Sequence, residues 1–260
     1  MSLDLRELPG ALFGSGAALR HTLTTWDAGI RGAVPTARRI GFVSLTPGVG
    51  VSTLAAAVVR AIAARRSEPL LAVDVSTGAL GLGDRLGFSP TAPNDDRWAA
   101  RTTADATAGL APGDGFLGLR PAASSGTVAT WLDEAAPITR FFDVSITDFG
   151  ARHPLIDLAE CAALCDTVCV VSDARRSPAE LARAVVPAIE GLPEAPTALL
   201  ALVDHTRAGD AVARAFAADG RVVGIPFDRG LRAGRGPHRP AARRAVLQLA
   251  SALVSGEVVA

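Results

Sequence analysis

The sequence has 260 residues, with 26 Lys or Arg against 26 Asp or Glu, so its formal net charge is zero. Every basic residue is an arginine, which excludes mechanisms that need a lysine ammonium group, such as a Schiff base, a Ser–Lys dyad or a P-loop lysine. Hydrophobic residues make up 49% of the chain, which excludes a disordered protein. The length is that of one large α/β domain with a full core.

The compartment is indicated by the cysteines and by the absence of sorting patterns. Cys161, Cys165 and Cys169 are an odd number and close together, so we expect buried free thiols rather than disulfides. The N-terminus has no signal-peptide pattern. The uncharged stretch 40–59 is long enough to span a membrane, but Thr-Pro-Gly-Val-Gly interrupts it. We expect a cytoplasmic protein with no transmembrane segment, which reaches the inner face of a membrane only through partners.

Apolar runs and helical patterns alternate along the chain. We expect an N-terminal extension over 1–37, with a helix at 16–31, followed by one domain over 38–260. Predicted strands are 40–45, 70–75, 116–122, 141–150, 167–173, 197–204 and 221–227; predicted helices are 52–66, 102–110, 127–136, 177–190, 208–218 and 240–256. This order predicts a three-layer α/β sandwich, in which a mostly parallel twisted sheet carries helices on both faces.

Two helix predictions carry further detail. Ser177 followed by Glu180 predicts a capping box at the start of the helix over 177–190. The C-terminal helix has its arginines only at its start, so we expect it to pack on the sheet rather than lie in a membrane.

Three predicted strands end in residues that meet at one edge of the sheet. The first strand runs into a glycine-containing loop over 46–53 and then a helix, an arrangement that directs backbone N–H groups toward an anion. Asp74 and Asp148 end two other strands, and ligands of open parallel sheets bind beyond these carboxyl ends. Such loops are common in α/β folds, and an Asp after a strand often caps a helix, so both interpretations stay open.

Over residues 38–256 the sequence resembles the ParA/MinD family of deviant Walker-A ATPases, whose fold is that of the P-loop NTPases. The resemblance lies in RIGFVSLTPGVGVSTLAAAV, LLAVDVSTGALGLGDRLG, FFDVSITDFGA, CDTVCVVSDA, ALLALVDHT and VVGIPFDRGLRAG. Within the family the chain is most similar to the EspI-like MinD proteins of actinobacterial type VII (ESX) secretion loci. The segments AVDVSTGALGLGDRLG, VVGIPFDR and RRAVLQLASAL carry this closer similarity.

The resemblance implies a vestigial or weak nucleotide site. Carried over position by position, its residues are Gly48, Val49, Gly50, Val51, Ser52, Thr53, Asp74, Asp148, Asp204 and Pro226. Ser52 and Asp148 would hold Mg²⁺ if a nucleotide binds. The implied ligands are therefore ATP and Mg²⁺, bound weakly.

The same comparison exposes departures from the family pattern. The signature lysine falls on Thr46, the first loop glycine on Pro47 and the P-loop lysine on Val51. Ser76 replaces the second Asp of switch I, and Asp204 replaces an Asn that reads adenine in the family. We therefore expect a pseudo-ATPase that acts as a regulatory or protein-binding module, with secretion-system components as partners and a homodimer through the old nucleotide face.

Two alternatives remain. An arginine could replace the lost lysines in an active ATP or GTP switch, and the candidates are Arg85, Arg152, Arg175, Arg176, Arg229 and Arg232. The second alternative is a DNA-associated partition factor that uses a basic patch of Arg229, Arg232, Arg235, Arg239, Arg243 and Arg244. No groove-reading motif accompanies this patch, so nucleic acid is not the favoured partner.

Overall fold

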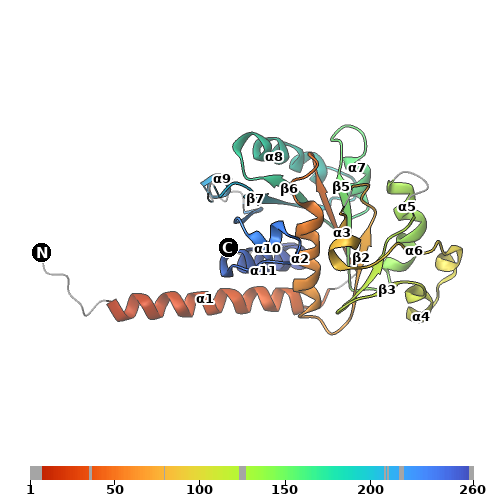
Figure 1. The fold of residues 1–260 in the computed structure, drawn as a ribbon, viewed down its shortest axis with the longest axis horizontal. Helices are drawn as coiled ribbons and strands as arrows, with labels where there is room; N and C mark the ends of the chain where they lie inside the picture. The colour runs from red at the N-terminus through yellow and green to blue at the C-terminus, as the bar shows by residue number, and fades with distance from the viewer. Residues whose placement is uncertain are drawn as a thin grey trace, which may run out of the picture.

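The computed structural model describes residues 8–34, 37–78, 80–122, 127–207, 209, 211–216 and 220–257, and side-chain packing from residue 16 onward. Its centre is an eight-stranded sheet with the order β3-β4-β2-β5-β1-β6-β7-β8 (Figure 1). Neighbouring strands are parallel, except for the antiparallel pair β3 and β4 at one edge. The predicted α/β class, with a mostly parallel sheet, is confirmed.

The strands form from short apolar runs that are buried on both faces, as expected of parallel sheets. Their bounds are β1 Arg38–Ser44, β2 Leu70–Asp74, β3 Ala111–Pro112, β4 Phe116–Leu119, β5 Val144–Ala151, β6 Thr167–Asp173, β7 Thr197–Val203 and β8 Val222–Ile225. Every residue of β2 and β6 is buried. In the register of β2 and β5, Asp74 pairs with Asp148, which brings the two predicted site carboxylates together.

The helices cover both faces of this sheet. They are α1 Leu8–Arg31, α2 Val51–Ala63, α3 Leu82–Leu86, α4 Thr103–Thr107, α5 Thr127–Glu134, α6 Ala136–Thr139, α7 Leu158–Ala163, α8 Arg176–Glu190, α9 Ala211–Phe216, α10 Arg229–Arg232 and α11 Pro240–Ser255, with a 3₁₀ helix at Asp95–Ala99. One core lies between the sheet and α2 with α11, and the other lies under α5 to α8. In the described part of the chain, no helix has both the length and the apolar character to cross a membrane.

Helix α1 forms an additional layer outside α11 (Figure 1). It begins earlier than the predicted residue 16, and residues 1–7 of the predicted extension lie outside the described residues. Gly29 of α1 faces Ser251 of α11 so closely that a Cβ at Gly29 would lie 2.3 Å from the Ser251 hydroxyl oxygen. The absence of a side chain at Gly29 therefore sets the distance between the two helices.

Two details of the helix predictions have opposite outcomes. The predicted capping box of Ser177 and Glu180 is wrong. Helix α8 begins at Arg176 with Arg175 as its N-cap, so Ser177 lies inside the helix, and Glu180 pairs with Arg176 at 2.8 Å. The C-terminal helix packs on the sheet as predicted, with Leu249 and Leu253 fully buried.

Candidate functional site

The loop between β1 and α2 has the backbone of an anion cradle. Gly48 and Gly50 have φ of 80° and 91°, a left-handed conformation that favours glycine. Gly50 is also the N-cap of α2, so the first N–H groups of that helix have no acceptor within it. Backbone donors and the helix dipole thus converge at this end of α2, as phosphate binding requires.

The side chains of the loop supply no positive charge. Val51, which the family resemblance places at the P-loop lysine, is the first residue of α2, is only 7% exposed and belongs to the core. Thr46 and Pro47 are exposed, and Pro47 has no N–H to donate. The loop therefore keeps the backbone half of a phosphate site and lacks the cationic half.

Asp148 is fully buried and lies within β5, which continues to Ala151 instead of ending at this residue as predicted. Burial raises the pKa of its carboxyl to about 7; the hydroxyl of Ser52 acts in the opposite direction, and the nearby Asp74 adds to the rise. Its Oδ1 accepts from the N–H of Gly150 at 3.0 Å, and its Oδ2 has no hydrogen-bond partner. A hydroxyl and a carboxylate are oxygen donors of the kind that Mg²⁺ prefers; Ser52 lines the cavity, and Asp148 lies behind it.

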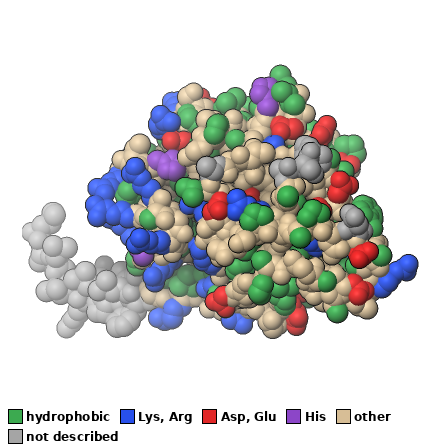
Figure 2. All heavy atoms as spheres, turned by 45° about the vertical axis from the view of Figure 1, so that its right-hand side comes forward, with side chains coloured by type: hydrophobic (Ala, Val, Ile, Leu, Met, Phe, Trp, Pro, Cys, Tyr) green, Lys and Arg blue, Asp and Glu red, His purple; other side chains and the backbone are tan. Residues whose placement is uncertain are grey.

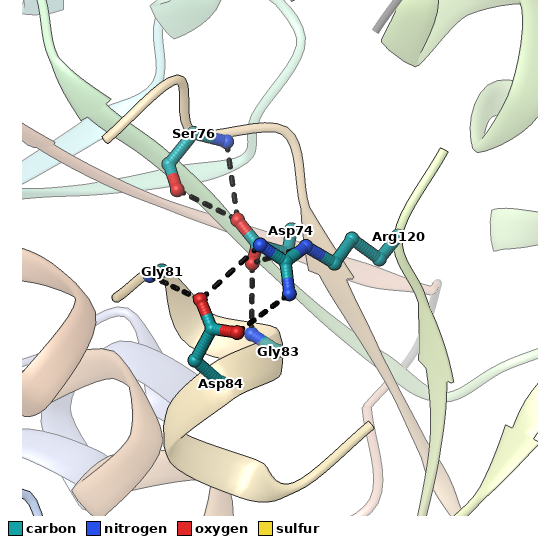
Figure 3. A network of polar contacts seen from close by, with 6 residues as sticks. All are labelled: Asp74, Ser76, Gly81, Gly83, Asp84 and Arg120. Atoms are coloured by element: carbon teal, nitrogen blue, oxygen red, sulfur yellow. Dashed lines mark hydrogen bonds and ion pairs between the residues drawn. The ribbon is translucent and has the colours of Figure 1, made fainter. Parts of the chain in front are cut away.

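Asp74 anchors the segment that follows β2 (Figure 3). Its Oδ1 accepts from the hydroxyl of Ser76 at 2.7 Å, and its Oδ2 accepts from the N–H of Gly83 at 2.8 Å. Arg120 forms ion pairs with two carboxylates. Its Nε lies 3.6 Å from Oδ2 of Asp74, and its Nη1 lies 2.9 Å from Oδ1 of Asp84. Both oxygens of Asp74 are thus engaged by groups of this chain that hold α3 in place.

A cavity of about 620 Å³ opens at this edge of the sheet. Several residues singled out from the sequence line this cavity: Gly48, Gly50, Val51, Ser52, Thr53, Ser76 and Asp204. The predicted residues Val49, Asp74, Asp148 and Pro226 are not among the residues that line it. Asp148 and Asp74 lie behind the lining: Asp148 accepts a hydrogen bond from the lining residue Gly150, and Asp74 accepts one from the lining residue Ser76.

Asp204 lines the cavity but its carboxylate serves the loop after β7. One oxygen accepts from the N–H of Thr206 at 2.9 Å, and the other accepts from the N–H of Gly209 at 3.0 Å. The next residue, His205, lies 3.2 Å through Nε2 from the carbonyl oxygen of Val49 in the glycine loop. Sequence reasoning missed His205, because nothing local in the sequence indicates a contact across 156 residues.

The six candidate arginines divide sharply. Arg85 and Arg232 line the cavity. The other four do not line the cavity. Three of them form ion pairs: Arg152 with Asp157, Arg175 with Asp173, and Arg176 with Glu180. The fourth, Arg229, is exposed. Burial lowers the pKa of Arg85, and the negative charge of Asp148 opposes this shift, so Arg85 interacts electrostatically with the carboxylate of Asp148 within β5. The Nε of Arg85 is buried and has no hydrogen-bond partner.

The predicted basic patch is a surface feature outside the cavity, apart from Arg232. Its arginines are exposed except for the half-buried Arg244, and Figure 2 shows Arg side chains gathered at the left of the visible face. One buried carboxylate, Asp228, orders the segment: it accepts from the N–H groups of Gly230, Leu231, His238 and Arg239 at 2.7 to 3.1 Å. Sequence reasoning missed this role.

The cysteines are buried, as predicted, and burial raises the pKa of the Cys161 thiol to about 12. Among the residues that the structure describes, no group of three or more His, Cys, Asp or Glu side chains is placed to hold a metal ion. The thiols are therefore part of the core.

Comparison with solved structures identifies the fold. No protein-family model and no curated protein sequence matches the chain. MinD, a cell division ATPase from Pyrococcus furiosus, is 20% identical and superposes with a TM-score of 0.64 over 85% of this chain and 99% of its own. A chain of the MinC:MinD cell division complex from Aquifex aeolicus is 18% identical, with a TM-score of 0.61 over 86% and 98%.

A ParA family ATPase from Chlorobium tepidum is also 18% identical and superposes with a lower TM-score of 0.56, over 86% of this chain and 97% of its own. At these identities the likeness concerns the fold. The chain therefore has the α/β fold of the ParA and MinD ATPases.

Proposed function

We propose that this chain is a pseudo-ATPase of the ParA/MinD type, which acts as a regulatory or protein-binding module. The observation that carries the proposal is Val51, an apolar side chain packed in the core at the start of α2, where the family's catalytic lysine stands. Ser76, at the position of the second switch acid, donates to Asp74 and offers no carboxylate to a water molecule. The loop geometry is kept while the groups for hydrolysis are absent.

The magnitude of the loss supports this conclusion. A hydrogen bond to a charged group contributes about 1.5–3 kcal/mol, so two missing ammonium groups weaken phosphate binding on the order of a hundredfold or more. Phosphoryl transfer depends almost entirely on positioning and charge stabilisation, so its transition state loses more than the bound nucleotide does. Ser52 and Asp148 would still hold Mg²⁺, which neutralises phosphate charge when a nucleotide is bound.

Protein binding is the function that remains for such a site. Leu155 and Ile156, which follow β5, are 90% and 73% exposed, and Leu80 at the cavity is 64% exposed. Large exposed apolar side chains at one edge favour contact with a protein, including a second copy of this chain. A fold relative is found in a complex of MinC with MinD. The segments that resemble EspI-like proteins favour partners from a type VII secretion system.

A second candidate function is a nucleotide switch in which arginine replaces lysine. The specific observation is that Arg85 and Arg232 line the cavity, with the buried Nε of Arg85 lacking a partner. Guanine recognition by Asp204 is not supported, because both of its oxygens accept from backbone N–H groups of its own loop.

The test compares ATP·Mg²⁺ binding and hydrolysis in the wild type and in Val51→Lys, with Val51→Met as the matched uncharged control. The pseudo-ATPase hypothesis predicts no turnover by the wild type, and about tenfold tighter ATP binding by Val51→Lys than by Val51→Met. Turnover by the wild type that is lost in Arg85→Ala would instead establish the arginine switch.

A further inference from the structure

A second cavity lies away from the carboxyl edge of the sheet, in a groove between α1, α2 and α11. Its volume is about 470 Å³. The floor is apolar, and its side chains are Leu23, Ala57, Ala61, Pro237, Pro240, Val246 and Leu247. None of these residues belongs to the candidate nucleotide site, so the groove needs an explanation of its own.

The remaining lining residues of this groove are all arginines: Arg60, Arg65, Arg243 and Arg244. Arg65 forms an ion pair with Asp27 at 3.0 Å. Arg60 and Arg243 donate only to backbone carbonyl oxygens, of Arg85 and Pro237. Within the described chain, Arg60, Arg243 and Arg244 form no ion pair, so the groove carries an excess of positive charge over an apolar floor.

A further arginine lies near this groove. Burial lowers the pKa of Arg60, and the like charge of the nearby Arg85 lowers it further. The groove is also continuous with the exposed arginines that Asp228 orders, since Pro237 belongs to that same segment. A ligand with negative charge would relieve this repulsion.

We propose that the groove binds an acidic amphipathic helix of a partner protein, with its apolar side chains on the floor and its carboxylates on Arg60, Arg243 and Arg244. A trough between packed helices accommodates a helix, whereas an extended peptide adds to a sheet edge, and the edge strands β3 and β8 lie elsewhere. Nucleic acid has phosphates for the arginines and nothing for the apolar floor. The inference does not depend on whether a nucleotide binds.

The probe is a fluorescein-labelled 18-residue peptide with leucines at helical spacing and glutamate and alanine elsewhere. Its control has the same composition, reordered so that the leucines share no face. Fluorescence anisotropy with the full chain is expected to show binding of the first peptide at least about tenfold tighter than the second, and gain of helix by circular dichroism on binding.

Two protein variants locate the binding. Arg243→Ala with Arg244→Ala is expected to weaken binding about tenfold or more, since two charge-assisted hydrogen bonds are lost. The matched control is Arg175→Ala with Arg176→Ala, another adjacent pair at a helix start, which should bind as the wild type does. Ala61→Glu keeps all arginines and places a carboxylate in the floor, so it should also abolish binding.

Three results would overturn the proposal. They are equal affinity for the two peptides, unchanged affinity in both groove variants while their thermal melting stays that of the wild type, and displacement of the peptide by a 30-base-pair DNA duplex that itself binds more tightly. The last result would assign the groove to a nucleic-acid surface.

Discussion

The hydroxyl of Ser76 donates a 2.7 Å hydrogen bond to Oδ1 of Asp74, while the N–H of Gly83 donates to the other oxygen of the same carboxylate. Ser76, at the position that the family resemblance assigns to a second switch acid, thus donates to the neighbouring Asp74. The bond from Gly83 connects β2 to α3, and together with the bond from Ser76 it makes Asp74 a structural anchor.

Replacement of Asp74 is therefore expected to cost stability. Asp74→Ala leaves the N–H of Gly83 and the hydroxyl of Ser76 without an acceptor and should lower the free energy of unfolding by about 3 kcal/mol, against about 1 kcal/mol for Ser76→Ala. Asp84→Ala, which removes the half-exposed partner of Arg120, should cost under about 1 kcal/mol. Urea unfolding measures all three, and equal losses for Asp74→Ala and Asp84→Ala would contradict the anchor role.

Asp148 should give the protein a specific pH dependence. Burial raises the pKa of this carboxyl to about 7 in the folded state, whereas in the unfolded chain the carboxyl releases its proton near its ordinary pKa of 3.8. Between these values the folded state binds more protons, so stability falls as pH rises. Asp148→Asn abolishes this effect and should gain about 2 kcal/mol or more over the wild type between pH 5 and pH 8. Parallel stability curves of the two proteins would refute this.

The backbone of the arginine-rich segment should depend on Asp228. Burial opposes the charge of this carboxyl, but the N–H groups of Arg239, His238, Leu231 and Gly230 outweigh that effect and hold its pKa below the usual value. Asp228→Ala releases these bonds, so trypsin is expected to cleave the segment many times faster than in the wild type. Asp133→Ala, which removes an exposed carboxylate, is the control and should leave the rate unchanged.

The packing of α1 on α11 can be tested by a double-mutant cycle. Gly29→Ala places a Cβ 2.3 Å from the Ser251 hydroxyl oxygen, and should lower the melting temperature through a clash of about 1–3 kcal/mol. Ser251→Ala removes that oxygen and leaves the Cβ of residue 251 at an ordinary 3.5 Å. The double variant should therefore regain the stability of the wild type or exceed it, because Ala favours a helix. Additive losses would disprove the close contact.

Much of the fold could be predicted from the sequence, since buried parallel strands are apolar throughout and glycines mark the loop before α2. The meeting of Asp74 and Asp148 was also predictable, because carboxyl ends of parallel strands share one edge. The choice of Arg85 and Arg232 among six arginines was not, since it depends on where α3 and α10 place them.

The errors have local causes. Ser177 and Glu180 satisfy the capping pattern, but an arginine one residue earlier continues the helix and captures the glutamate. Short helices such as α3 and α7 have too few turns to show a periodic pattern. The contact of His205 with Val49 joins segments that only the folded sheet brings together.

Asp228 belongs to two places at once: it lines the nucleotide-type cavity, and it ties down the segment whose Pro237 borders the groove beside α11. Loss of this one carboxylate is therefore expected to disturb both the lining of the cavity and the segment that borders the groove.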